Sequence, residues 1–333
     1  MLIEPTPRGL YCAAGDFYID PWRPVDRAVI THAHGDHARP GSRAYLAAKR
    51  GLPVLQTRLG PEARIEGLEY GEARGIGGAR VSLHPAGHVL GSSQVRVEHG
   101  GEVWVVSGDY KLDPDPTCEP FEPVRCHAFV TESTFGLPIY RWRSHAEIFG
   151  AIDRWWGANA AQGRASVLFG YAFGKAQRIL ASVDATIGPI FVHGAVETLN
   201  RGYRECGVAL PPTRLATEIA KAEAAGALIV APPSAQATPW LRRFGDYSDA
   251  FASGWMQIRG ARRQRAVDQG FVLSDHADWP SLASAIAGTG AERIFVTHGS
   301  VETMVRWLTE QGYDAQPIAT EFEGEAGAEE SGA

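Results

Sequence analysis

The stretch THAHGDHARPG, residues 31–41, decides how this sequence is interpreted. Three histidines and one aspartate fall close together in it, at His32, His34, Asp36 and His37. The whole chain of 333 residues has only 11 histidines. The stretch overlaps the end of RAVIT (27–31), a run whose β-branched residues predict a strand. This cluster of histidines and an aspartate therefore indicates a functional site at the end of a strand.

Alternate residues of an extended segment point to the same side. The side chains of His32, His34 and Asp36 are therefore expected on the same side, whereas that of His37 can point elsewhere. One metal ion could therefore bind His32 and His34, and a second could bind Asp36 and His37. Imidazole and carboxylate ligands suit zinc or manganese, and the lack of thiolate argues against a purely structural zinc. The alternative is a polar loop with an accidental cluster of histidines.

Three further candidate ligands follow other predicted strands. PAGHVLGSS (85–93) contains His88, VWVVSGDYKLD (103–113) contains Asp109, and FVTHGS (295–300) contains His298. The strand ends of a sandwich converge along one edge, where such side chains can meet. Together with the first four residues they make seven candidate ligands for two ions.

Composition limits the classes of protein that fit. The net charge is −6, from 32 basic and 38 acidic residues, so a globally basic nucleic-acid binder is not indicated, although a local basic groove remains compatible. The four cysteines form no CxxC pair, which predicts reduced thiols in a cytoplasmic protein. We expect no signal peptide and no membrane span, because neither kind of apolar run is present.

The secondary-structure pattern changes along the chain. The first 140 residues predict short strands, including a hairpin whose turn contains HGG (99–101). From about residue 144, helical and strand patterns alternate, which predicts a parallel α/β unit. After residue 270 the chain returns to strands separated by helices. The sequence thus belongs to the α/β class.

The order HxHxDH, AGHxxGS, SGDY and a distant His-Gly resembles the metallo-β-lactamase fold. The resemblance implies an αββα sandwich in which His32, His34 and His88 bind one metal. It implies that Asp36, His37 and His298 bind the other, with Asp109 bridging both. Asp20, in FYIDPW (17–22), matches the family's preceding aspartate and is expected to support a ligand histidine.

Three further motifs resemble those of the β-CASP nucleases. VTESTFG (130–136) contains Glu132, LSDHADWP (273–280) contains His276, and VTHGS (296–300) contains His298. The resemblance is closest to the bacterial DNA ligase-associated DNA exonucleases, through segments such as GDFYIDPWRPVDRAVITHAH (15–34). It implies a discontinuous metallo-β-lactamase domain at 1–140 and 268–322, a β-CASP cap domain at 141–267, and a disordered tail at 323–333.

The resemblance also implies a mechanism. Two zinc or manganese ions activate water for in-line attack on a phosphodiester. Asp36 is expected to be both a ligand and the residue that orients the water. His276 is the candidate general acid, held by Glu132. The alternative for His276 is a histidine that only caps a helix.

Four residues are candidates for substrate binding. Arg141 and Arg143, in RWR, supply local positive charge; Lys175 opens a helix after a glycine-rich turn; and His193 ends a predicted strand. The alternatives are a solvated basic face, an ordinary strand-to-helix turn, and a structural histidine.

The sequence therefore predicts a two-metal DNA exonuclease that acts in repair with an ATP-dependent DNA ligase and a helicase. An RNA-processing nuclease with the same centre is the main alternative. A small-molecule hydrolase and an inactive nucleic-acid-binding scaffold fit less well, because the insert and all seven ligands are present. Digestion polarity, strand preference, the identity of the ions and the oligomeric state stay open.

Overall fold

The computed structural model describes residues 1–258, 260 and 266–322. The described chain divides into two compact units: Met1–Arg141 with residues 276–322, and Trp142–Asp275. We call them the first and the second unit. The expected tail at 323–333 lies outside the described residues.

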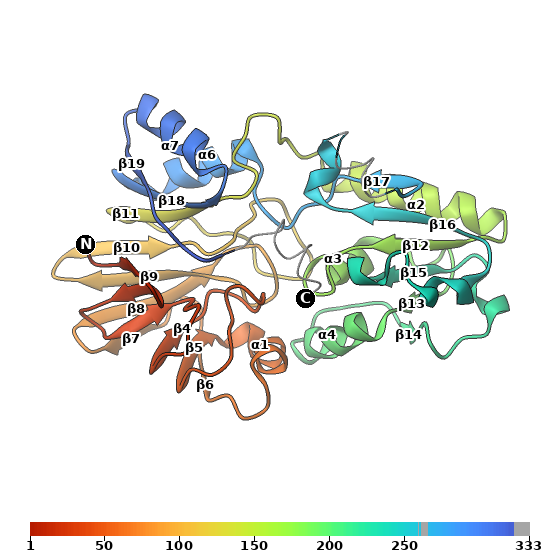
Figure 1. Ribbon diagram of the computed structural model, residues 1–333, viewed down its shortest axis with the longest axis horizontal. Helices are drawn as coiled ribbons and strands as arrows, with labels where there is room; N and C mark the ends of the chain where they lie inside the picture. Colours follow the sequence, from red (N-terminus) through yellow and green to blue (C-terminus); the bar gives the residue numbers. More distant parts are fainter. Residues whose placement is uncertain (259, 261–265, 323–333) are drawn as a thin grey trace. The chain divides into compact units, whose positions relative to one another are not determined.

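The first unit contains two sheets (Figure 1). One has six strands in sequence order: β1 (Glu4–Thr6), β2 (Gly9–Cys12), β3 (Phe17–Ile19), β4 (Arg27–Val29), β5 (Ala44–Ala48) and β6 (Ile65–Leu68). The other has seven, in the order β19 (Asp314–Pro317), β18 (Arg293–Gly299), β11 (Ala128–Ser133), β10 (Glu102–Val106), β9 (Ser93–His99), β8 (Ala79–Pro85) and β7 (Ala73–Ile76).

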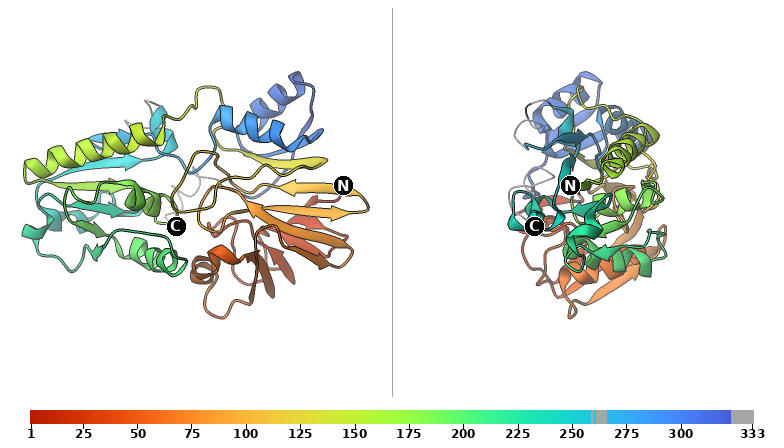
Figure 2. Two further views of the ribbon diagram at one scale, coloured as in Figure 1. Left: turned by 180° about the vertical axis from the view of Figure 1, so that it is seen from behind. Right: turned by 90° about the vertical axis from the view of Figure 1, so that its right-hand side faces the viewer.

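The two sheets of the first unit pack face to face. One apolar core joins Phe17, Ile19 and Leu46 of the six-stranded sheet to Val95 and Trp104 of the seven-stranded sheet. Helices α6 (Trp279–Thr289) and α7 (Val301–Glu310) cover the other face of the seven-stranded sheet (Figure 2). Helix α1 (Leu52–Leu59) also belongs to this unit and is preceded by the 3-10 turn η1 (Lys49–Gly51).

The predicted hairpin is confirmed between β9 and β10, which pair in antiparallel register from His99 and Glu102. Its two turn residues, Gly100 and Gly101, have φ angles of 58° and 84°. A two-residue turn with both φ angles positive matches the right-handed twist of the flanking strands, and glycine adopts it without strain.

The second unit contains one parallel sheet, as the alternating pattern predicts. Its strand order is β14 (Arg214–Leu215), β13 (Ile190–Val192), β15 (Leu228–Ala231), β12 (Ala165–Phe169), β16 (Tyr247–Ala252) and β17 (Gln269–Phe271). Because β17 pairs with β16, it belongs to this sheet, and the second unit extends beyond the expected boundary at residue 267.

Alternating side chains give the parallel sheet two apolar faces. Leu168 and Val230 pack with helices α2 (His145–Ala161), α3 (Lys175–Ser182) and α4 (Gly194–Glu205). Val167 and Ile229 face the opposite way, toward residues of the 3-10 turns. These turns are η2 (Lys221–Ala224), η3 (Pro233–Ala235), η4 (Pro239–Phe244) and η5 (Gly254–Gln257).

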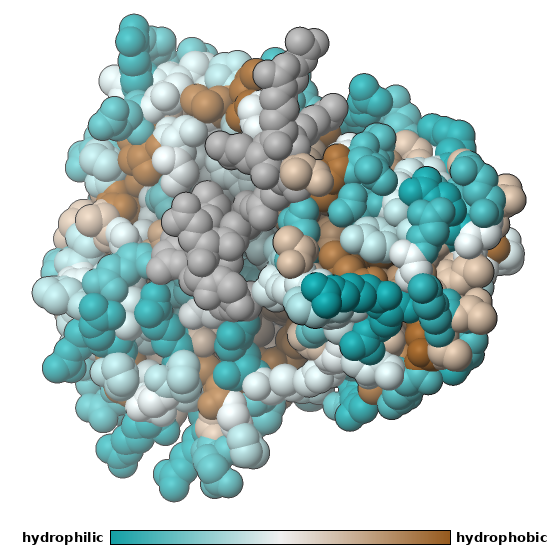
Figure 3. Space-filling view, turned by 45° about the vertical axis from the view of Figure 1, so that its right-hand side comes forward, coloured by the Kyte–Doolittle hydropathy of each residue, from teal (hydrophilic) through white to brown (hydrophobic). Residues whose placement is uncertain are grey.

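The α/β class predicted from the sequence is confirmed by this mixture of sheets and helices. Across the described ranges 1–258, 260 and 266–322, no helix combines the length and the apolar character that crossing a bilayer requires. On the face shown in Figure 3, hydrophilic side chains predominate and apolar ones form small scattered patches.

Candidate metal centre

The candidate ligands lie where strands of the first unit end. His32 follows β4, His88 follows β8, Asp109 follows β10, and His298 stands near the end of β18. Strands β10, β11 and β18 are parallel, and β8 runs in the same direction because two antiparallel pairings separate it from β10. Their carboxyl ends therefore share one edge of the sheet.

The first group of candidate ligands is His32, His34, His88 and Asp109, whose potential ligand atoms all lie within 4.8 Å of one another. His32 Nε2 is 3.5 Å from Asp109 Oδ2, and His88 Nε2 is 3.9 Å from the same oxygen. His88 Nε2 and His34 Nδ1 are 3.0 Å apart. The structure thus gathers three histidines, from two remote segments, around one carboxylate.

The second group lies close to both oxygens of the same carboxylate. His298 Nε2 lies 3.2 Å from Asp109 Oδ1, and His37 Nε2 lies 3.5 Å from Asp109 Oδ2. His37 Nε2 is also 3.7 Å from Asp36 Oδ2. Glu132, Asp109 and His298 form a group with ligand atoms within 4.8 Å. Asp109 is therefore shared by both groups.

The polar atoms of this cluster fit metal ions. The ring nitrogens His32 Nε2, His37 Nε2 and His298 Nε2 are buried and have no hydrogen-bond partner among the described residues, and the same is true of Asp109 Oδ1. Buried polar groups without partners are costly in a folded protein. Divalent ions would satisfy all four atoms, and the nitrogen and oxygen donors suit zinc or manganese.

Burial sets the charge of two of the candidate histidine ligands. It lowers the pKa of His34 to about 4 and the pKa of His32 well below its usual range. Both rings are therefore neutral at pH 7, which leaves a nitrogen lone pair on each for metal binding.

Asp20 connects the two ends of the segment 31–37, which carries four candidate ligands and which we call the ligand loop. Its Oδ1 accepts a hydrogen bond from Thr31 N at 2.7 Å, and its Oδ2 accepts one from Thr31 Oγ1 at 2.5 Å. His37 Nδ1 lies 2.7 Å from Asp20 Oδ2. Because a carboxylate only accepts, Nδ1 of His37 carries the proton and Nε2 is left for a metal. Burial raises the pKa of Asp20, and hydrogen bonding to His37 and Thr31 opposes this rise.

Glu132 and His276 form a buried pair beside the ligands. His276 Nδ1 lies 2.8 Å from Glu132 Oε2, and Glu132 Oε1 accepts a hydrogen bond from Tyr110 N at 2.8 Å. The ring of His276 lies 4.7 Å from that of the candidate ligand His88, measured between centroids. The carboxylate thus fixes a proton on Nδ1 of His276 and orients its ring.

The predicted substrate-binding residues have different surroundings. Arg141 and Arg143 are exposed. Lys175 is buried, with its ammonium 3.6 Å from Asp275 of the same unit. His193 caps helix α4, since its Nδ1 accepts a hydrogen bond from Ala195 N at 3.2 Å. Lys175 and His193 thus have partners within the second unit, and their substrate contacts stay predictions.

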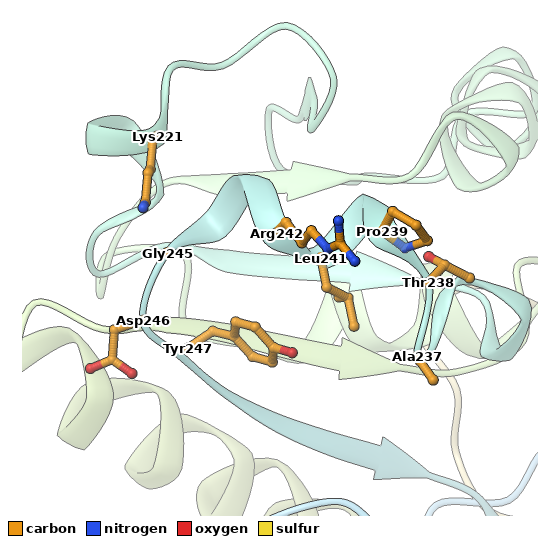
Figure 4. A pocket seen from close by; sticks show the side chains of 9 residues that line it. All are labelled: Lys221, Ala237, Thr238, Pro239, Leu241, Arg242, Gly245, Asp246 and Tyr247. Atoms are coloured by element: carbon orange, nitrogen blue, oxygen red, sulfur yellow. The ribbon is translucent and has the colours of Figure 1, made fainter.

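The second unit contains a separate open pocket of about 640 Å³ (Figure 4). In that view Lys221 and Arg242 lie above Tyr247, and Asp246 lies beside Tyr247. None of its lining residues is a candidate ligand or a predicted substrate contact.

Sequence reasoning missed two residues at the centre. Phe322 stacks on His37, with ring centroids 4.3 Å apart and planes inclined by 20°. Arg58, at the end of α1, donates from Nε to the carbonyl of Ala33 at 3.3 Å. A lone phenylalanine or arginine remote from every motif carries no sequence signal of such contacts.

No family model matches the chain. It is 30% identical over 321 residues, 96% of its length, to a probable DNA ligase of Opitutus terrae, of which it spans 31%. It is 26% identical over 161 residues, 47% of its length, to the endoribonuclease YSH1 of Gibberella zeae, of which it spans 19%. The chain thus spans less than a third of each of these longer relatives.

Among solved structures, a protein of unknown function from Enterococcus faecalis aligns with a TM-score of 0.57 at 13% identity. The alignment covers 89% of this chain and 79% of that one, which shows a related fold. The curated relatives include a probable DNA ligase and endoribonucleases, and these similarities are consistent with the resemblance of the chain to the β-CASP metallo-β-lactamase nucleases.

Proposed function

We propose that this chain is a two-metal nuclease that hydrolyses phosphodiester bonds at the end of a DNA strand. The observation that carries the proposal is the position of Asp109, whose two carboxylate oxygens lie close to histidines of two separate groups. A shared carboxylate of this kind would hold two ions a few ångströms apart. We infer that the first unit is the αββα sandwich and the second the β-CASP cap.

The ligand assignment follows the two groups. His32, His34 and His88 would bind one ion and Asp36, His37 and His298 the other, with Asp109 bridging. Two such ions, when bound, lower the pKa of water and stabilise the anionic transition state of phosphodiester hydrolysis. Asp36 adds a carboxylate oxygen that can orient the attacking water.

His276 is the proposed general acid. Its Nδ1 proton is held by Glu132, so its Nε2 can hold a proton and transfer it to the leaving oxygen. The backbone N–H of Tyr110 fixes the other oxygen of Glu132, so the carboxylate cannot easily rotate away. The helix-cap alternative is disfavoured, because Asp278 is the residue that caps α6.

DNA is favoured over RNA as substrate by the extent of the similarities. The relative named a probable DNA ligase matches 96% of the chain, whereas the relative named an endoribonuclease matches 47%. The first similarity also supports an association with a DNA ligase, because the matching region is part of a protein with that name. A helicase partner and action in repair extend the same proposal.

The substrate is tested by comparing end-labelled single-stranded DNA, duplex DNA and RNA of one sequence, with manganese or zinc. We expect mononucleotide release from DNA that starts at one labelled end. Cleavage of RNA alone would replace this proposal by the RNA-processing alternative. Hydrolysis of the β-lactam nitrocefin without cleavage of any nucleic acid would indicate a small-molecule hydrolase.

A further inference from the structure

Arg58 is held against the ligand loop of the first unit. It lies in the last turn of α1, and its Nε donates to the carbonyl oxygen of Ala33 at 3.3 Å. Ala33 stands between the ligands His32 and His34 in the chain. The guanidinium group is therefore fixed beside the residues that would hold the first ion.

Gly35 lets the guanidinium lie close to the loop. A Cβ atom at this position would come within 3.3 Å of Arg58 Nη1 and 3.5 Å of Cζ. The next residue is the ligand Asp36, whose charge opposes the fall in the pKa of Arg58 that burial causes. Arg58 thus packs on the segment between two ligands, and its charge is felt by one of them.

Several arginines of the first unit form ion pairs with glutamates, and Arg58 does not. Arg23, Arg50 and Arg74 each bind a glutamate, whereas Arg58 forms no ion pair with any residue in the described ranges. The loop covers part of the guanidinium, which lowers its pKa, and the rest of the residue is exposed. A partly exposed guanidinium, anchored through Nε and without a carboxylate partner, presents two Nη groups in the geometry that suits an oxyanion.

We propose that Arg58 binds a backbone phosphate of the nucleic acid next to the metal centre. This inference rests on the proposed nuclease function and names one contact of that site. The phosphate would take the place of the carboxylate partner that Arg58 lacks. Arg58 would contribute to substrate binding, with no part in proton transfer.

The test compares Arg58→Ala, Arg58→Lys and the control Arg80→Ala. Arg80 is exposed and lies at the start of β8, about 17 Å along the strand from the end that leads to His88. The readouts are kcat and KM for a labelled DNA strand, bound metal per chain, and oligonucleotide affinity in the His276→Ala background. The affinity is measured at several salt concentrations.

We expect Arg58→Ala to raise KM and the dissociation constant about tenfold, as for loss of a charged hydrogen bond. The salt slope of the affinity should fall by about 0.7–0.9, the value for one phosphate contact. Both kcat and the metal content should stay at the wild-type level. Arg58→Lys should recover part of the affinity, and Arg80→Ala should behave like the wild type.

Two results would overturn the inference while leaving the nuclease function intact. Arg58→Ala could bind DNA as Arg80→Ala does, or it could lose metal, which would make Arg58 a residue that only positions the ligand loop. If the wild-type chain with its metals neither bound nor cleaved nucleic acid, the proposed function itself would fail, and this inference with it.

Discussion

The ring of Phe322 stacks on the ring of His37, with centroids 4.3 Å apart. Phe322 also meets His298 and Trp22 edge to face, at 6.1 Å and 5.8 Å. The ion pair of Arg23 with Glu321, 3.0 Å long, holds the neighbouring residue. One aromatic side chain from the end of the described chain thus covers two candidate ligands of the second ion.

Phe322→Ala should destabilise the protein by about 3 kcal/mol, because it removes a buried aromatic ring from three ring contacts. It should also weaken binding of one of two ions, since His37 and His298 become exposed to water. Urea unfolding and titration with Mn²⁺ measure the two effects. Phe322→Tyr keeps the ring and serves as the control. Unchanged metal binding in Phe322→Ala would show that the ring does not support the ligands.

Asp20→Ala should lower metal affinity about 10- to 100-fold, as loss of a group that orients a metal ligand typically does. The substitution frees Nδ1 of His37 and leaves the hydroxyl of Thr31 without its acceptor. Thr31→Ser keeps that hydroxyl and should retain nearly full affinity. Competition with a chromophoric chelator gives both affinities. Equal affinities for the two variants would contradict this role of Asp20.

His276→Ala should keep both ions but lower turnover by about 10²- to 10⁴-fold, the usual contribution of general acid catalysis. Glu132→Gln should also lower turnover, because an amide orients the imidazole less well and does not stabilise its charged form. His99→Ala changes an exposed histidine and is the control. Single-turnover cleavage with metal analysis separates the effects, and full activity in His276→Ala would remove it from the mechanism.

Gly108 and Gly100 form a matched pair for testing the approach of two strand ends. Both have a φ of 58°. A Cβ atom at Gly108 would lie 2.7 Å from Thr31 Cβ, whereas one at Gly100 would meet nothing within 4 Å. Gly100→Ala should cost about 1 kcal/mol, through backbone strain alone. Gly108→Ala should cost more and should reduce metal binding, because it pushes Asp109 away from the His32 loop. Thermal unfolding and metal analysis of both variants test this, and equal behaviour would contradict it.

The gathering of the candidate ligands could be predicted because they carry local signals. His32, His88 and Asp109 each follow a strand-like run, and strands that run in one direction bring such residues to one edge. Contacts without a pattern could not be predicted: Phe322 reaches His37 across most of the chain's length, and Arg58 reaches Ala33 through the position of α1. The second unit extends beyond the boundary expected at residue 267 because it includes β17. This strand is short, and only its pairing with β16 shows to which sheet it belongs.

The most direct test of the central claim is a crystal structure of the metal-loaded protein with anomalous scattering data. The account predicts two metal peaks, one near His32, His34 and His88 and one near Asp36, His37 and His298, with Asp109 in contact with both. A single peak, or ions bound by residues outside these two groups, would contradict it.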